Sequence, residues 1–240
     1  MEKLCYAVSR VADSPVEAVA SWLHDDVVAA VRDDPAVLGA RVLAEAPEGA
    51  AMRVGTGPEG TLLAGLVALW VGTYQDRTVL ESFLKAGPAA RCEGWLVSES
   101  LPQGDPPTPR PPGERSPGLT TVTLLDKRPG LDEAEFYRLW HEVHRITTAE
   151  VHPFTLYARN EVVRALTPGA RPLRGIVYES TATVEDTLDP QRFFGAHGDD
   201  EVFKANIQRV MSETMAFIDY DTMETVPMHE LVVRALPGRA

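Results

Sequence analysis

The segment LDEAEFYRLWHEVHRITTAEVHPFTLYARN, residues 131–160, predicts a helix that runs directly into a strand. Asp132 can cap the start of the helix, and Glu135, three residues further on, can complete a capping box. After Pro153 the apolar residues recur with a period of two, which is the period of a strand.

One face of this predicted helix carries a histidine among mostly apolar side chains. Residues at spacings of three and four share that face, and they are Phe136, Trp140, Val143, His144 and Thr147. An apolar helix face is normally buried, and a buried polar group needs a partner or a function. His144 is therefore our main candidate for general acid–base chemistry. The alternative is a core histidine that is hydrogen-bonded to the backbone.

These residues and their flanks resemble the EthD family of the dimeric α/β-barrel superfamily. The sequence LLDKRPGLDEAEFYRLWHEVHRI, followed by YARNEV, is similar to the family's strand, glycine turn, helix with F-x-x-x-W-x-x-x-H, and next strand with Tyr and Asn. The positions that match are Lys127, Gly130, Leu131, Phe136, Trp140, His144, Tyr157 and Asn160. The later segment MAFIDYDTMETVPMHELVV resembles the family's helix end and last strand. The resemblance spans residues 119–234 and implies a fold more strongly than a reaction.

Composition excludes several classes of partner. The chain has 240 residues and a formal net charge of −12, which argues against nucleic acid and against anionic membrane surfaces. Residues 1–20 lack the pattern of a signal peptide, and the most apolar segment, residues 62–72, has about half of the ~20 residues that a membrane span needs. Cys5 and Cys92 lie in apolar segments, which favours reduced thiols. We expect a cytoplasmic protein.

The chain contains the same order of elements twice. In residues 1–101 we predict strands at residues 3–10, 37–44, 62–73 and 93–98 and helices at residues 15–33 and 77–85. In residues 119–240 we predict strands at residues 120–126, 154–162, 174–182 and 226–233 and helices at residues 132–151 and 200–218. Between them, residues 102–118 hold seven prolines and three glycines, which predicts an extended linker.

The repeat is also visible in the residues themselves. PAVLGAR at residues 35–41 and PFTLYAR at residues 153–159 match at four positions with an offset of 118. The order βαββαβ is typical of a ferredoxin-like module, whose sheet keeps one bare face. Two such modules must pack together, which predicts an α+β protein that forms a dimeric α/β barrel within one chain. Such a chain can be a monomer, although a homodimer is also allowed.

The histidines are distributed unequally between the two halves. Five of the six lie in residues 119–240 and only His24 lies in the first half, so we expect an active site in the second half and a scaffold in the first. Besides His144, we predict Tyr157 and His229 as catalytic residues. Tyr157 could donate to a carbonyl or phenolate oxygen, or could simply pack between layers. His229 on the last strand could face a pocket or the surface.

Five further residues are predicted to bind the substrate, namely Phe136, Trp140, His141, Asn160 and His197. Tyr157 and Asn160 point to opposite faces of a regular strand, so they meet in one pocket only at a bulge or a strand end. His197 lies in a glycine-flanked loop that could be a lid or a solvated turn. His141 and His144 are spaced to share a metal, but no Cys or Asp follows on that face, so we predict no metal.

The motifs for nicotinamide, nucleotide, serine-hydrolase and zinc-protease chemistry are absent from the sequence. The resemblance implies a cofactor-free enzyme of aromatic or polyketide-type secondary metabolism, such as antibiotic biosynthesis, that works as a cyclase, decarboxylase or isomerase. A cofactor-independent monooxygenase needs the same base and is the first alternative. The others are a non-catalytic small-molecule binding or stress-response barrel and, least favoured, a haem-binding barrel.

Overall fold

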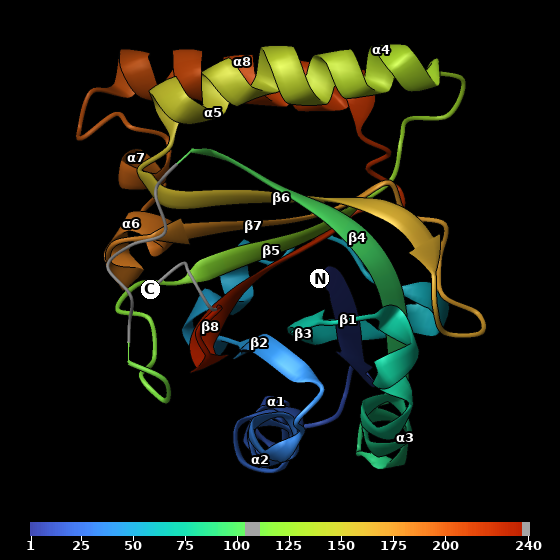
Figure 1. Ribbon diagram of the computed structural model, residues 1–240. Coiled ribbons are helices and arrows are strands. Elements are labelled where there is room, and N and C mark those ends of the chain that lie inside the picture. Colours follow the sequence, from blue (N-terminus) through green and yellow to red (C-terminus); the bar gives the residue numbers. More distant parts are fainter. Residues whose placement is uncertain (104–110, 237–240) are drawn as a thin grey trace.

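The structure, a computed structural model, describes residues 1–103 and 111–236. Its strands close into one barrel, and helices cover the barrel on two opposite sides (Figure 1). The strands of the first half are β1 (Glu2–Arg10), β2 (Val37–Glu45), β3 (Leu62–Val71) and β4 (Arg91–Gln103). Those of the second half are β5 (Thr120–Leu125), β6 (Phe154–Ala165), β7 (Gly175–Thr181) and β8 (Glu224–Arg234).

The strand order shows how two modules make one barrel. Around the barrel the order is β1-β3-β2-β8-β5-β7-β6-β4, and neighbouring strands pair antiparallel. The order is β4-β1-β3-β2 in the first half and β8-β5-β7-β6 in the second. If the strands of each half are numbered one to four along the chain, both halves have the ferredoxin-like order 4-1-3-2. The halves join where β2 meets β8 and where β4 meets β6. The predicted fold class, an α/β barrel formed within one chain from two βαββαβ modules, is confirmed.

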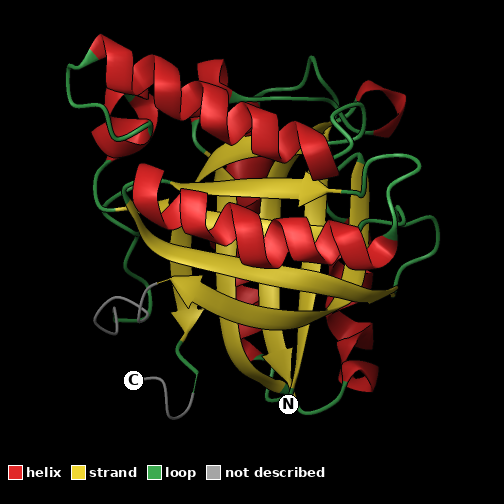
Figure 2. Cartoon of the chain, turned by 90° about the horizontal axis from the view of Figure 1, so that it is seen from above, coloured by secondary structure: helices red, strands yellow, loops and turns green. Residues whose placement is uncertain are grey.

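Helices form the outer layers. The first half contributes α1 (Val16–Trp22), η1 (Leu23–Val27), α2 (Val28–Asp33) and α3 (Thr78–Ala86), with short turns η2 (Pro47–Met52), η3 (Pro58–Gly60) and η4 (Tyr74–Arg77). The second half contributes α4 (Glu133–Arg138), η5 (Leu139–His144), α5 (Arg145–Val151), α6 (Val184–Leu188), α7 (Pro190–Phe193) and α8 (Asp200–Phe217). Figure 2, seen from above, shows long helices lying over the sheet. Within the described residues, no helix has the length and apolar character to span a membrane.

The helix predicted from residue 132 differs from the expectation in two details. Asp132 does cap it, accepting hydrogen bonds from the backbone N–H groups of Ala134 and Glu135, but the Glu135 side chain pairs with Arg138 instead of completing a capping box. The helix also passes through a π-helical segment, η5. The first helix of the other half contains a π-helical segment, η1, at the corresponding place. Such segments are rare and frequently occur at functional sites.

Alternating strand residues separate three apolar clusters. One lies inside the barrel and includes Trp95, Ile176 and Tyr178, and the other two fill the spaces between the sheet and the helices of each half. The helix–sheet cluster of the second half is the smallest, with Phe136, Trp140 and Phe217 among its members. It leaves room for the cavity described below.

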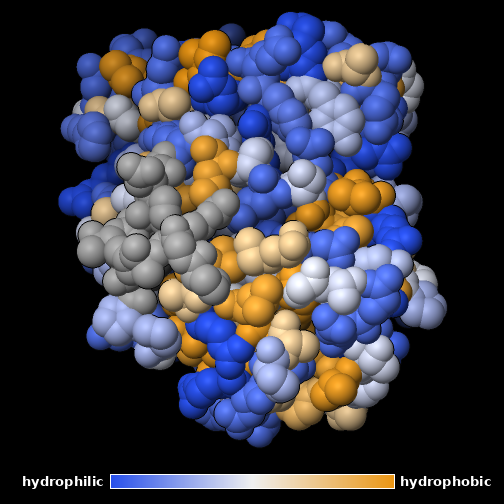
Figure 3. Space-filling model, in the orientation of Figure 1, coloured by the Kyte–Doolittle hydropathy of each residue, from blue (hydrophilic) through white to orange (hydrophobic). Residues whose placement is uncertain are grey.

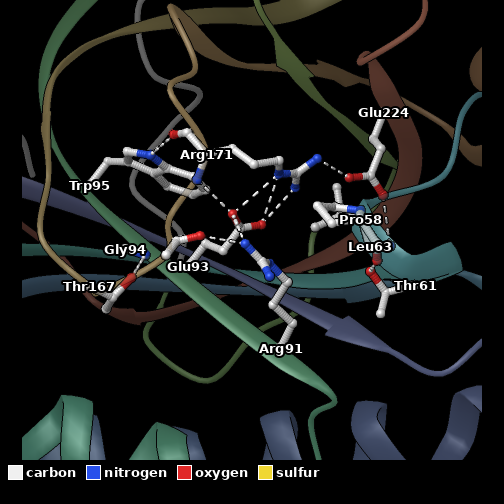
Figure 4. A network of polar contacts seen from close by, with 11 residues as sticks. Pro58, Thr61, Leu63, Arg91, Glu93, Gly94, Trp95, Thr167, Arg171 and Glu224 are labelled. Carbon is white, nitrogen blue, oxygen red and sulfur yellow. Dashed lines mark hydrogen bonds and ion pairs between the residues drawn. The ribbon is translucent and has the colours of Figure 1, made fainter.

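Arg171, in the loop between β6 and β7, ties the two halves together inside the barrel (Figure 4). Its Nε donates to Glu93 of β4 at 2.9 Å, and its Nη1 donates to Glu224 of β8 at 2.7 Å. The other oxygen of Glu224 accepts from the backbone N–H of Leu63 on β3. Although burial alone would raise the pKa of Glu93, hydrogen bonds from Arg91 and Arg171 hold it below its usual value. Breaking such buried pairs is costly, so this network stabilises the closed barrel.

The predicted linker, residues 102–118, is only partly covered, because residues 104–110 lie outside the described part of the chain. Strand β4 extends two residues into it, to Gln103. On its far side Arg115 forms a bridge with Leu231, and the N–H of Gly113 donates to the carbonyl of Val232, so this part follows the edge of β8.

The face in Figure 3 is mostly hydrophilic over the upper helices, whereas apolar side chains gather over the barrel strands below.

Candidate functional site

A cavity of ≈ 340 Å³ lies between the sheet of the second half and the helices above it. Strands β5 to β8 form its floor, while η5 and α8 form its roof. Its lining is largely apolar and aromatic, with residues such as Leu125, Val177, Val210, Met211, Phe217 and Met223. The volume lies at the lower end of the range of small-molecule pockets. Among the described residues that line it, none is a lysine or an arginine.

His144 lines this cavity from the π-helical segment and is 9% exposed. Its Nδ1 is 3.5 Å from Oε2 of Glu213 on α8, a contact that falls just short of a hydrogen bond. The other carboxylate oxygen of Glu213 accepts a hydrogen bond from Oγ1 of Thr147 at 2.7 Å, which fixes the carboxylate beside the imidazole. Burial lowers the pKa of His144, and Glu213 opposes this shift. The side chain is therefore an uncharged base at neutral pH, with Nε2 left for a ligand.

Tyr157 lies on β6 and lines the cavity from the sheet side. The indole Nε1–H of Trp140 donates to its hydroxyl oxygen at 3.2 Å. Burial raises the pKa of Tyr157, which keeps the phenol neutral. Because Trp140 occupies an acceptor site on that oxygen, the phenol can still donate its own proton to a ligand.

Glu179, on β7, is a further titratable group in the cavity. Burial raises the pKa of its carboxyl to about 8. The side chain is partly exposed and lines the cavity, whose other lining residues are largely apolar and aromatic. The patterns in the sequence do not single out Glu179 as a site residue. The available signal was a carboxylate within the otherwise apolar and hydroxylic strand GIVYEST.

An aromatic group closes one end of the cavity. His152 follows α5, and its Nδ1–H donates to the backbone carbonyl of Phe193 at 2.8 Å. Its ring stacks on Phe154 at 4.8 Å between centroids, while Phe193 and Phe194 also line the cavity. Burial lowers the pKa of His152 to about 4, so it too is uncharged. These residues were not predicted, although Phe193 and Phe194 begin the segment FFGAHGDD around His197, in which a lid was considered.

Of the eight predicted site residues, the structure brings Trp140, His144 and Tyr157 to the cavity. Phe136 is fully buried behind it and packs on Trp140 and Phe217. Asn160 points into the barrel, where its Nδ2 donates to the carbonyl of Ile176 at 2.8 Å. The register shift in β6 lies near its start, between Phe154 and Leu156, so Tyr157 and Asn160 keep opposite faces.

The three other predicted residues lie elsewhere. His141 is half-buried outside the cavity, with Nε2 3.6 Å from Glu161, and burial together with Arg159 lowers its pKa to about 4. Its ring and that of His144 thus face different carboxylates. His197 is exposed in the loop before α8. His229 lies in a separate polar pocket beside His24, where its Nε2 is 2.8 Å from Glu48.

The chain matches no family model and no curated protein sequence. Among solved structures, an anthrone oxidase-like protein is similar with a TM-score of 0.55 and 12% identity, covering 99% of this chain and 96% of that one. A mutant chlorite dismutase from Candidatus Nitrospira defluvii in complex with cyanide is similar with a TM-score of 0.49 and 10% identity, covering 97% of this chain and 91% of that one. A protein provisionally named a monooxygenase from Lactobacillus acidophilus has a TM-score of 0.44 and 8% identity, covering 98% of this chain and 97% of that one. The first of these similarities extends over both halves of this chain and shows that the two proteins share a fold.

Proposed function

We propose that this chain is a cofactor-free enzyme that binds a small aromatic or polyketide-type molecule in the helix–sheet cavity and removes a proton from it with His144. The observation that carries the proposal is a buried imidazole at the wall of an apolar cavity, with the carboxylate of Glu213 3.5 Å from its Nδ1. A base must lie within reach of the substrate and be unprotonated at working pH. His144 lines the cavity and burial lowers its pKa, which supports this role.

Tyr157 has a complementary role in this proposal. A substrate that loses a proton beside a carbonyl group develops negative charge on the carbonyl oxygen. A hydrogen-bond donor fixed in an apolar site stabilises that charge more than water does. The hydroxyl of Tyr157, held by Trp140 on the floor of the cavity, can supply this donor. Glu213, for its part, stabilises the imidazolium that forms on His144.

The reaction that follows proton removal separates two candidates. A cyclase, decarboxylase or isomerase would use the carbanion directly, as the resemblance to EthD proteins implies. A monooxygenase would let the carbanion reduce oxygen. The second candidate is favoured by the name of one similar fold, an anthrone oxidase-like protein. Oxygen uptake that matches product formation would assign the monooxygenase, and turnover without oxygen would assign the lyase or isomerase.

Anthrone is a suitable probe, because it is an aromatic ketone with an acidic methylene group. We expect the protein to accelerate the exchange of the methylene hydrogens with deuterium under anaerobic conditions. His144→Gln should slow the exchange by about 10²-fold or more, the usual contribution of a general base. His24→Gln, which changes the histidine of the first half, is the matched control and should leave the rate unchanged.

Four results would contradict the proposal. Full activity of His144→Gln, together with loss of activity in His24→Gln, would place the site in the first half. Saturable anthrone binding without exchange would assign a binding protein. Absence of both binding and exchange would contradict the substrate class. A Soret band in protein purified with haem would instead assign His144 as an axial ligand, since a carboxylate-held imidazole also suits that role.

A further inference from the structure

We propose that Glu179 is the acid of this site and that the substrate is an uncharged ketone whose carbonyl oxygen receives the proton of Glu179. This inference rests on the proposed function and adds to it a second catalytic residue and a charge state of the substrate. The first support is position. Glu179 on β7 lies directly opposite Tyr157 on β6 in the strand register, and both side chains line the cavity. A carbonyl oxygen at the sheet floor could thus meet both groups.

The second support is the absence of a counter-charge. Elsewhere in the described residues, buried carboxylates of the barrel are paired with arginines: Glu45 with Arg53, Glu93 with Arg171, Glu224 with Arg171, and Glu230 with Arg41. Glu179 has no hydrogen bond or ion pair with any described residue, and neither lysine nor arginine lines its cavity. A carboxylate that served only the packing would be expected to have such a partner.

The groups that face Glu179 from every side support the same state. His144 comes from the helix above, His152 from the turn after α5, Tyr157 from the neighbouring strand and Tyr220 from the segment after α8. Burial lowers the pKa values of both histidines, so neither brings a positive charge at neutral pH. Burial alone raises the pKa of Glu179 to about 8, and the group therefore carries its proton at pH 7.

The proton transfers balance without any co-reactant. The carbon–hydrogen bond of the substrate breaks, and its proton goes to Nε2 of His144. The electron pair of that bond moves into the conjugated system, and the π pair of the carbonyl takes the proton of Glu179, which yields an enol. His144 is then an imidazolium beside Glu213, and Glu179 is a carboxylate. Both return to their resting states by exchange with water. In protein catalysis a pair of groups with opposed pKa shifts often divides the roles of acid and base in this way.

The same arrangement selects against anions. The cavity offers phenol and carboxylic acid donors but no lysine or arginine among the described residues, and a carboxylate ligand would be desolvated there without a counter-ion. A neutral ketone accepts both donors at no such cost. We therefore expect anthrone to bind at pH 7 and anthracene-9-carboxylate, an anion of similar size, to bind at least about tenfold more weakly.

The test uses the full chain with Glu179→Gln, which keeps the shape but cannot give up a proton, and Glu185→Gln as the matched control on the exposed helix α6. In wild-type protein the anthrone exchange rate should fall at acid pH as His144 gains a proton, and above about pH 8 as Glu179 ionises. Glu179→Gln should lose the alkaline fall and about 10²-fold in rate. Glu185→Gln should keep both features of the wild type.

An independent readout needs no turnover. Infrared difference spectra should show the carbonyl band of a protonated carboxylic acid in wild-type protein at pH 6.5, absent from Glu179→Gln and lost as the pH passes about 8. The role of Glu179 would be overturned if the exchange rate of Glu179→Gln still fell at alkaline pH as in wild type. It would also be overturned if the wild-type spectrum lacked the carbonyl band. If His144→Gln is inactive in the same assays, that result leaves the proposed function standing. Equal binding of the anion would overturn the inference about substrate charge.

Discussion

The carboxyl of Glu179 should make the folded protein less stable as the pH rises. Its pKa is about 8 in the fold against a usual value of 4.5, so the folded state holds a proton that the unfolded state has lost. Stability therefore falls between pH 4.5 and 8. We expect Glu179→Gln to be more stable than wild type at pH 8, by about 1–3 kcal/mol once water in the cavity is allowed for.

Urea unfolding at pH 4 and pH 8 measures this difference. At pH 4 the carboxyl of Glu179 approaches full protonation in both the folded and the unfolded wild-type protein, so wild type and Glu179→Gln should have similar free energies of unfolding. Glu185→Gln changes an exposed side chain, and this variant should be no more stable than wild type at either pH. A Glu179→Gln protein that is no more stable than wild type at pH 8 would show that Glu179 is ionised in the fold.

Single residues also show what the sequence could and could not reveal. Helical periodicity puts His144 on the same helix face as Trp140, and in the structure both side chains line the cavity. Its partner Glu213 lies 69 positions further along the chain, as the numbers 144 and 213 show, and only tertiary packing brings the two together. Glu179 shares a strand face with Val177, but strand periodicity does not tell which face is filled and which borders a cavity.

At the scale of elements, a close approach between a helix and a strand sets the shape of the cavity. Gly175, the first residue of β7, lies directly against the indole of Trp140, so a Cβ there would overlap the ring. We expect Gly175→Ala to destabilise the protein by about 1–3 kcal/mol, the usual cost of overpacking, and to move Trp140 away from Tyr157. Thermal unfolding and near-ultraviolet circular dichroism measure the two effects.

Gly72→Ala is the control for this variant. A Cβ at Gly72 would lie 3.9 Å from its nearest neighbour, a carboxylate oxygen of Asp76, which is ordinary contact. We expect little change in unfolding temperature there. If Gly175→Ala is equally harmless, the helix can shift without cost, and the contact between Trp140 and Tyr157 does not depend on the spacing of the two elements.

The limits of prediction for elements have physical causes. Most strand boundaries lie within three residues of the predicted ones because period-two patterns and turn residues mark them, whereas β4 continues to Gln103, five residues beyond its predicted end at residue 98. The π-helical segments η1 and η5 were not foreseen, since one extra residue in a helical turn leaves the local composition unchanged. Strand β8 explains the place of His229. Thr225, in the first part of β8, lines the cavity of the second half. The later part of β8 pairs with β2, so His229, only four positions after Thr225, lies beside the first half.

At the scale of the whole molecule, the second half should not be stable alone. Within the barrel, β6 is paired with β4 and β8 is paired with β2, both from the first half. A fragment of residues 119–240 would expose both strand edges and the apolar inner face of its sheet. We expect it to aggregate or to form an artificial homodimer, in which β8 of one copy pairs with β6 of the other.

Size-exclusion chromatography with light scattering distinguishes these outcomes, with the full chain as the reference. A soluble, monomeric and fully folded fragment would contradict the dependence of the second half on the first. The division into a catalytic half and a scaffold is a separate proposal, which the comparison of His144→Gln with His24→Gln addresses.

The covalent joining of the two halves has a consequence for behaviour at low abundance. A barrel assembled from two separate chains dissociates on dilution, since its association follows mass action. In this chain the partners of β2 and β4 are tethered, so their effective concentration is fixed by the connection and not by the amount of protein present. The cavity should therefore persist, and specific activity should stay constant, down to the most dilute solution in which turnover can be measured.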